Sequence, residues 1–281
     1  MIDLHTHTNA SDGIYSPEAL IDLAAEHGID VIAVCDHDTV SGLDRAAAAA
    51  RAKGITIVPG IEFSIKYEHG TFHLLGMYVD WYNEALLSRI NELTEKRATR
   101  VERMVEDLNK HGVEISMDDV MRGVSGDALG RPHVARALIA AGYARNIKDV
   151  FSRYLEEGLP GYVPKDKISF EEAVELIAGA GGLPVLAHPA TLNIKQPDEL
   201  AAYVKRLAEG GLVGIEVYSN MHDEEQIAFF KKIAAEMKLL ETGGSDFHGD
   251  KKESLGCYRY AQPVPEKLYL RLKEFYEKKM M

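Results

Sequence analysis

Cysteine is nearly absent from the chain. Its 281 residues include two cysteines, Cys35 and Cys257, and neither lies in a CxxC or Cys-His spacing. This excludes a thiolate zinc site and a disulfide framework. Cys35 ends the apolar run at residues 31–35, where a buried reduced thiol is the simplest interpretation.

Long hydrophobic runs are missing as well. No apolar run approaches the roughly 20 residues that a membrane-spanning helix needs. The first residues, Met1 to His5, have neither the basic region nor the apolar region of a signal peptide. We therefore expect a cytoplasmic protein that makes no contact with a membrane.

Positive charge is scarce: 32 Lys and Arg stand against 44 Asp and Glu, which gives a formal net charge of −12. This balance disfavours broad binding to duplex nucleic acid, which depends on many Lys and Arg contacts to phosphates. A phosphorylated small molecule or the end of a short oligonucleotide stays compatible, because bound divalent cations would supply positive charge locally. The composition does not indicate an oligomeric state.

Apolar strands alternate with helices at both ends of the chain. Ser16 and Pro17 are typical of a helix start, and Gly28 of the helix end. Strands are expected at residues 2–4, 31–35, 55–58, 71–79, 183–187, 213–217 and 239–241. The alternation predicts βαβ units and a mostly parallel sheet, which makes this an α/β protein.

The alternation stops between residues 83 and 160. A long, charged helix is expected over 83–111, with shorter helices near 117–122, 133–141 and 147–155, and no strand is evident. We interpret residues 83–160 as a helical insertion that covers or flanks a domain made of residues 1–82 and 161–281.

Histidines and acidic residues gather where the expected strands end. His5 and His7 follow the first strand, and two residues apart on an extended chain they point to the same side. Six of the eleven histidines have such a position: His5, His7, His37, His73, His188 and His248. Asp36, Asp38, Glu62 and Asp246 accompany them. The carboxyl ends of parallel barrel strands converge in space, so these side chains are expected to meet.

Each of these residues also has an ordinary interpretation. A single His after a strand is usually a hydrogen-bonded loop residue, an Asp before a helix is usually an N-cap, and Asp12 in Ser11-Asp12-Gly13 resembles a turn residue. Such an explanation would have to hold separately for each of the six histidines, and this makes it a poor account of the whole pattern. Imidazoles and carboxylates without thiolates suit Zn, Mn or Fe, so the pattern favours a metal cluster.

The motifs resemble those of the PHP (polymerase and histidinol phosphatase) family of metal-dependent phosphoesterases. They are His5-Thr6-His7 with Asp12, Asp36-His37, Glu62, His73, Ala187-His188-Pro189 and Ser245-Asp246-Phe247-His248. The resemblance spans nearly the whole chain and implies a distorted (β/α)7 barrel with a helical insertion.

The resemblance also implies nine metal ligands and three divalent metals, with Mn, Fe or Zn as candidates. The ligands are His5, His7, Asp12, His37, Glu62, His73, His188, Asp246 and His248. Glu62 would bridge two metals. By the same analogy one metal takes His5, His7 and Asp246; another takes His73 and His188; the third takes Asp12, His37 and His248. The residues predicted to serve catalysis directly are His5, His7, Glu62, His188, Asp246 and His248.

The size of the chain and its insertion make it similar to the nucleotide-directed members of the family. The expected activity is hydrolysis of phosphate monoesters or terminal phosphodiesters of nucleotides, 3′,5′-bisphosphonucleotides or short RNA 5′ ends, by a metal-activated hydroxide. One alternative is a histidinol-phosphate phosphatase. An alternative of another class is a non-catalytic, metal-binding regulatory module, although the complete ligand set argues against a decayed site.

Two groups of residues are candidates for substrate contact. Gly130-Arg131-Pro132-His133 offers the planar guanidinium of Arg131 and a fixed helix start, and Lys165 follows where the chain returns to the barrel. Solvation of Arg131 beside an ordinary helix start is the alternative. Ser219, Asn220 and His222 follow another expected strand, and loop capping explains them equally well.

Overall fold

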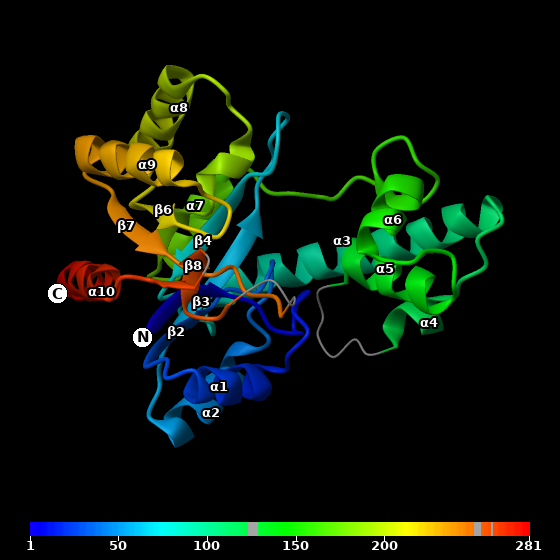
Figure 1. Cartoon of the computed structure of the whole chain (residues 1–281), viewed down its shortest axis with the longest axis horizontal. Helices are drawn as coiled ribbons and strands as arrows, with labels where there is room; N and C mark the ends of the chain where they lie inside the picture. The colour runs from blue at the N-terminus through cyan, green and yellow to red at the C-terminus, as the bar shows by residue number, and fades with distance from the viewer. Residues whose placement is uncertain (123–128, 250–253, 260) are drawn as a thin grey trace.

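Seven strands form one barrel-like sheet in the computed structural model, which describes residues 1–122, 129–249, 254–259 and 261–281. Their order in the sheet follows the chain (Figure 1): β1 (Ile2–Thr6), β2 (Val31–Val34), β3 (Thr56–Ser64), β4 (His73–Met77), β5 (Leu183–Leu186), β6 (Gly214–Tyr218) and β7 (Leu240–Gly243). The sheet closes on itself where the end of β1 meets the segment after β7. Thr6 pairs there with Phe247, and the His7 N–H donates to the Phe247 carbonyl at 2.9 Å. The predicted α/β barrel is confirmed.

Most neighbouring strands are parallel, as expected, but the fourth strand runs in the opposite direction. β4 is antiparallel to both β3 and β5. β3 runs to Ser64, well past the expected end at residue 58, and a short turn then leads into β4. Ser64 pairs with His73, so the start of β4 lies at the edge of the sheet where β3 and β5 end. His73 therefore reaches the same edge as the other histidines through a reversed strand.

Helices cover the outside of the sheet, and several of them begin at a capping side chain. Ser16 accepts a hydrogen bond from the Ala19 N–H at 3.2 Å, with Pro17 in the first turn. The barrel helices are α1 (Pro17–Glu26), α2 (Leu43–Lys53), α7 (Phe170–Gly179), α8 (Pro197–Glu209), α9 (Glu224–Met237) and α10 (Lys267–Met280). A 3-10 turn, η2 (Pro189–Leu192), follows β5, and a small hairpin of β8 (Cys257–Arg259) and β9 (Gln262–Pro263) was not expected.

The described residues between β4 and α7 form several helices and no strand, and most of this segment stands to one side of the barrel (Figure 1). It contains α3 (Glu84–Lys110), α4 (Met117–Met121), α5 (Arg131–Ala140), α6 (Ile147–Val150) and the π-helical turn η1 (Phe151–Leu155). α3 joins two apolar cores, since Leu86 and Leu93 pack in the barrel core and Met104 and Leu108 in a separate insertion core. None of the helices in the described part of the chain is long and apolar enough to cross a membrane.

Gly244 lies where β1 and the end of β7 come very close. A Cβ atom at this position would lie 2.5 Å from both the backbone nitrogen and the Cβ of His5. Because neither backbone has room to move, we expect Gly244→Ala to lower the free energy of unfolding by about 1–3 kcal/mol, measured by urea denaturation. Gly179→Ala in α7 is the matched control, since its Cβ meets no atom within 4 Å. Equal stability of the two variants would contradict the expectation.

Candidate metal centre

Two histidines lie at the carboxyl end of β1, His5 within the strand and His7 directly after it. They are two residues apart, so both rings point to the same side. Their Nε2 atoms are 3.2 Å apart, and both side chains are buried. Two imidazole nitrogens at this distance from each other indicate a shared positive ligand or a shared proton.

Glu62 lies at the centre of the cluster, and its carboxylate oxygens approach the imidazoles of five histidines. Its Oε1 atom is 3.0 Å from His73 Nδ1 and 3.1 Å from His188 Nε2. Its Oε2 atom is 3.0 Å from His37 Nδ1, 3.3 Å from His7 Nε2 and 3.4 Å from His5 Nε2. Each carboxylate oxygen thus faces a different group of nitrogens, which is the geometry that a bridging ligand needs.

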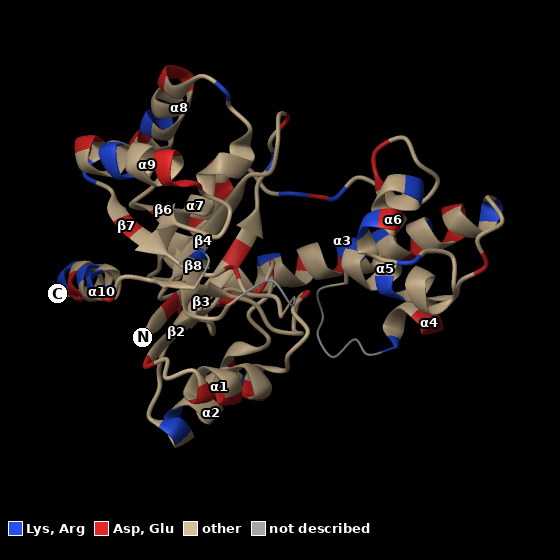
Figure 2. Ribbon diagram, in the orientation of Figure 1, with Lys and Arg blue, Asp and Glu red and all other residues tan. Residues whose placement is uncertain are grey.

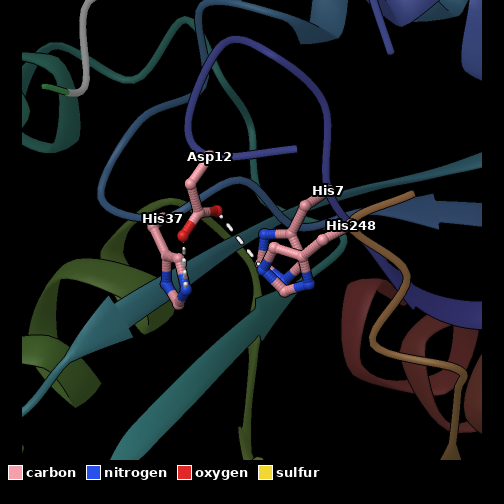
Figure 3. A group of neighbouring side chains, drawn as sticks. All are labelled: His7, Asp12, His37 and His248. Carbon is pink, nitrogen blue, oxygen red and sulfur yellow. Dashed lines mark ion pairs between the residues drawn. The ribbon is translucent and has the colours of Figure 1, made fainter. Parts of the chain in front are cut away.

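Asp12 and Asp246 complete the cluster on either side of His7. Asp246 Oδ1 is 3.1 Å from His7 Nε2, and Asp12 Oδ1 is 3.3 Å from His248 Nε2. Figure 3 shows Asp12 directed toward both His37 and His248, while the rings of His7 and His248 stack with centroids 4.1 Å apart. Residues from six separate chain segments therefore converge here, namely 5–12, 37, 62, 73, 188 and 246–248.

The nine expected ligands form one continuous cluster, but their grouping differs in part from the one that the resemblance implies. Potential ligand atoms lie within 4.8 Å of one another in three sets: His7, Asp12, His37 and His248; His5, His7, Glu62 and Asp246; His37, Glu62 and His73. His7 and His37 each belong to two sets. His188 lies outside these sets, although its Nε2 atom is close to Glu62.

The donor atoms of the cluster fit divalent cations. Oε2 of Glu62 is buried and has no hydrogen bond of good geometry, although three imidazole nitrogens surround it. Burial alone would raise the pKa of Glu62, but His37, His73 and His5 hold it well below its usual range. His5 and His7 likewise offset the effect of burial on Asp246, whose pKa is lowered. Ionised carboxylates and imidazoles with lone pairs directed at common points are the ligands that Zn, Mn and Fe bind.

A second layer of buried carboxylates supports the ligands from behind, and of these the sequence motifs included Asp36 but missed Glu216. Glu216 Oε1 is 3.2 Å from His5 Nδ1, and its Oε2 accepts the His188 N–H at 2.7 Å. A proton on His5 Nδ1 leaves its Nε2 atom available to the cluster. Asp36 accepts the Thr8 N–H at 2.8 Å and the Ser11 hydroxyl at 2.6 Å, which fixes the loop that carries Asp12.

Asp3 has a comparable role where the barrel closes. It accepts hydrogen bonds from the Ser245 N–H at 2.9 Å and the Ser245 hydroxyl at 2.6 Å, and from the Gly256 N–H at 2.7 Å. Burial raises the pKa of Asp3 to about 6, although these hydrogen bonds oppose the shift. Asp3 thus connects β1 to the segment that presents Asp246.

A cavity of about 350 Å³ lies between the cluster and the helical insertion. Asp12, His37 and His73 line one side of it. Its cations come from α3, from the start of α5 and from the segment that returns to the barrel: Arg97, Arg100, Arg131, Lys165 and Lys167. In Figure 2 the returning segment, between the insertion and the barrel, carries basic residues on either side of an acidic one. We call this cavity the cationic cleft.

Three of these cations, Arg97, Arg100 and Lys167, were missed in the sequence, although a signal for the two arginines was present. Leu93, Arg97, Arg100 and Met104 are spaced by four, three and four residues, so they share one face of α3. Arg97 and Arg100 are each only 7% exposed. Charged residues on the apolar face of a helix are unusual, and buried arginine generally serves a partner or a ligand.

The predicted substrate contacts fall into two places. Arg131, His133 and Lys165 line the cationic cleft. Ser219, Asn220 and His222 do not line it. Asn220 Nδ2 donates to the Ser245 carbonyl at 2.6 Å, and His222 Nδ1 is 2.9 Å from the Val217 carbonyl. These bonds match the loop-capping alternative, and a substrate contact from this second group stays a prediction.

Known proteins share both this sequence and this fold. The PHP domain family matches residues 3–209. A 3′,5′-nucleoside bisphosphate phosphatase of Chromobacterium violaceum is 36% identical over 248 residues, 88% of this chain and 87% of the relative. The 5′-3′ exoribonuclease Rnm of Escherichia coli is 33% identical over 252 residues, 88% of this chain and 84% of the relative. A Bifidobacterium adolescentis structure, provisionally described as a metal-dependent phosphoesterase, has a TM-score of 0.85 and 32% identity and covers 96% of this chain and 94% of its own.

The barrel and its cluster of imidazoles and carboxylates define a metal-dependent phosphoesterase, a hydrolase. Within this class the chain belongs to the PHP family. The resemblance found in the sequence motifs is thereby confirmed over most of the chain.

Proposed function

We propose that this protein hydrolyses terminal phosphoesters of nucleotides, with 3′,5′-bisphosphonucleotides or short 5′-phosphorylated RNA as substrates. The observation that carries the proposal is the cationic cleft, which places five basic side chains directly beside the ligand cluster. Arg and Lys in a water-poor pocket are ligands for phosphate oxygens. The names of the relatives from Chromobacterium violaceum and Escherichia coli support the same substrate class.

The distribution of the cations supports a substrate with more than one phosphate. Arg97 and Lys165 lie together, joined through one carboxylate. Burial lowers the pKa of Arg100 to about 10 and also lowers that of Lys167, and Arg131 adds to both shifts, so these cations also lie near one another. Five cations along one cleft exceed what a single phosphate needs, and they fit two phosphates of one nucleotide or two successive phosphates of an RNA end.

We further propose that the nine clustered side chains hold three divalent ions, with Mn, Fe or Zn as candidates. Bound cations supply a water of lowered pKa and neutralise phosphoryl oxygens. The side chains of this protein do the rest. Glu62 and Asp246 hold negative charge at the base of the site, Arg97 and Lys165 bind the phosphoryl group, and the insertion residues Arg131 and His133 orient the remainder of the substrate.

Two other functions compete with this proposal. A histidinol-phosphate phosphatase requires only one phosphate, which leaves several of the five cations of the cleft without a partner. A non-catalytic metal-binding module requires no phosphate-binding cleft. The five cations of the cleft therefore favour the nucleotide over both alternatives.

The test is a turnover assay of metal-reconstituted protein with Mn, Fe or Zn. The substrates are a 3′,5′-bisphosphonucleotide, a short 5′-phosphorylated RNA and histidinol phosphate, and the readout is released phosphate or nucleotide. Turnover of either nucleotide substrate, with kcat/KM well above that for histidinol phosphate, supports the proposal. Preference for histidinol phosphate, or no turnover of any phosphoester with any metal, rejects it.

Arg131→Ala isolates the contribution of the insertion. Loss of a charge-assisted hydrogen bond, worth about 1.5–3 kcal/mol, is expected to raise KM for the bisphosphonucleotide about 10- to 100-fold with a smaller change in kcat. Steady-state kinetics of the reconstituted enzyme measure this. Arg45→Ala is the matched control, because Arg45 is an exposed arginine on α2 that pairs with Glu18 at 2.7 Å. An unchanged KM in Arg131→Ala would show that this arginine does not contact the substrate.

A further inference from the structure

Asp38 follows the expected ligand His37 and is fixed against β3. It is buried and adopts a left-handed backbone conformation with φ of 50°, which is uncommon for a residue other than glycine. Its N–H donates to the Glu62 carbonyl at 3.0 Å, and its Oδ1 atom accepts the Ser64 N–H at 3.0 Å. These two bonds hold the Asp38 carboxylate in one place beside the cluster.

The other oxygen of Asp38 binds two cations from outside the barrel sheet. Oδ2 is 2.9 Å from Lys165 Nζ, on the segment that returns from the insertion, and it also pairs with Nη2 of Arg97 on α3. Lys165 Nζ donates to the Ser64 hydroxyl at 2.5 Å, and Arg97 Nη1 donates to the His37 carbonyl at 3.4 Å. One carboxylate therefore organises two of the five cations of the cleft.

Arg97 and Lys165 need such a partner because they are like charges in a buried place. Burial and the neighbouring Arg97 and Arg100 hold the pKa of Lys165 well below its usual range, against the opposing effect of Asp12. The direct contact that offsets the repulsion is with Oδ2 of Asp38. Asp38 supplies one negative charge to two cations. The excess positive charge stays available for an anion in the cleft, and removal of the carboxylate leaves two cations that repel each other.

We propose that Asp38 is a positioning residue that holds Arg97 and Lys165 in place to receive the phosphoryl group of the substrate. This inference rests on the proposed phosphoesterase activity on nucleotides and extends it to a residue that is neither among the nine expected ligands nor a lining residue of the cleft. Asp38 acts through the two cations. A purely structural ion pair would stabilise the fold without affecting phosphate binding.

Asp38→Asn tests the proposal, because the amide keeps an oxygen to accept the Ser64 N–H but loses the negative charge. In the metal-reconstituted enzyme we expect KM for the nucleotide to rise about 10- to 100-fold, as for other supporting residues behind a site, with kcat changed much less. The affinity for inorganic phosphate, measured by calorimetry, should fall by a similar factor. The metal content should equal that of the wild type, because the nine expected ligands are intact.

A double-mutant cycle separates positioning from a general effect on the fold. If Asp38 acts through Lys165, the KM effects of Asp38→Asn and Lys165→Met should be clearly non-additive in the double variant. Glu18→Gln is the control for loss of an acidic residue from an exposed ion pair. Additive effects, or wild-type KM and phosphate affinity in Asp38→Asn, would overturn the proposal, and so would a loss of metal in that variant.

A milder variant keeps the proposal testable if Asp38→Asn does not fold. Ser64→Ala removes only the hydroxyl that receives Lys165 and leaves the backbone bond to Asp38 intact, so it should weaken phosphate binding in the same direction by a smaller factor. Unchanged phosphate affinity in Ser64→Ala would then overturn the proposal. Phosphate affinity is measured without turnover, so failure of the nucleotide assay in the wild type is distinguishable from failure of this inference.

Discussion

Replacement of Glu62 by Gln is expected to abolish hydrolysis. Gln has nearly the same shape, but it carries no charge and offers one acceptor oxygen where Glu62 places one oxygen beside His73 and His188 and the other beside His37. Glu62 would hold divalent ions through both oxygens, and Gln would offer them only one neutral oxygen. A loss of about 4 kcal/mol in transition-state stabilisation corresponds to about a 1,000-fold decrease in kcat/KM.

Two measurements distinguish loss of metal from loss of fold in Glu62→Gln. Elemental analysis should show less bound metal than in the wild type, and added Mn should raise the melting temperature of the wild type but much less that of the variant. Glu92→Gln is the control, because Glu92 forms an exposed ion pair with Arg89 at 2.7 Å. Full metal content together with activity within tenfold of the wild type would contradict a bridging role for Glu62.

The barrel and the positions of the clustered residues could be predicted because both depend on local patterns. Apolar strands that run directly into His5 and His188 identify the strand ends, and strand ends in a barrel converge whatever their separation in sequence. The helix starts at Ser16 and Asn83 were equally local, since each side chain caps its own helix. A residue pattern within one segment was sufficient in these cases.

The reversed direction of β4 and the exact grouping of the ligands could not be predicted, because they depend on contacts between distant segments. β3 continues through Pro59 to Ser64 and turns back into β4, although proline is uncommon inside a strand. No local signal distinguishes this reversal from a parallel connection. His7 and His37 take part in two ligand sets because the side chains of several strands lean toward one another.

The cationic cleft illustrates the same limit. Arg97 and Asp38 are 59 positions apart and come from different parts of the molecule, so their pairing depends on where α3 leaves the barrel. Arg131 and Lys165 were predicted from turns and helix starts, which are local. Ser219 and His222 were predicted as substrate contacts from their polar character. In the structure both side chains take part in hydrogen bonds within the protein, which explains that polar character without a substrate.

Removal of divalent metal should inactivate the protein and lower its stability together. Without cations, the ionised Glu62 and Asp246 stay buried, and Oε2 of Glu62 together with the Nδ1 atoms of His7 and His37 have no hydrogen bond of good geometry; burial of such polar atoms is costly. A metal present at 100 times its Kd adds about 2.7 kcal/mol per site to the free energy of unfolding, so several sites together give a large effect.

The experiment is a chelation followed by a metal titration. The apo protein should show no phosphoesterase activity and a lower melting temperature, and Mn, Fe or Zn should restore both. If three sites exist, elemental analysis at saturation should approach three metals per chain. Restored activity with a single equivalent would reduce the centre to one essential metal, and full activity of the chelated protein would show that the clustered imidazoles act without metal. A lower melting temperature without loss of activity would mean that the cations serve the fold alone.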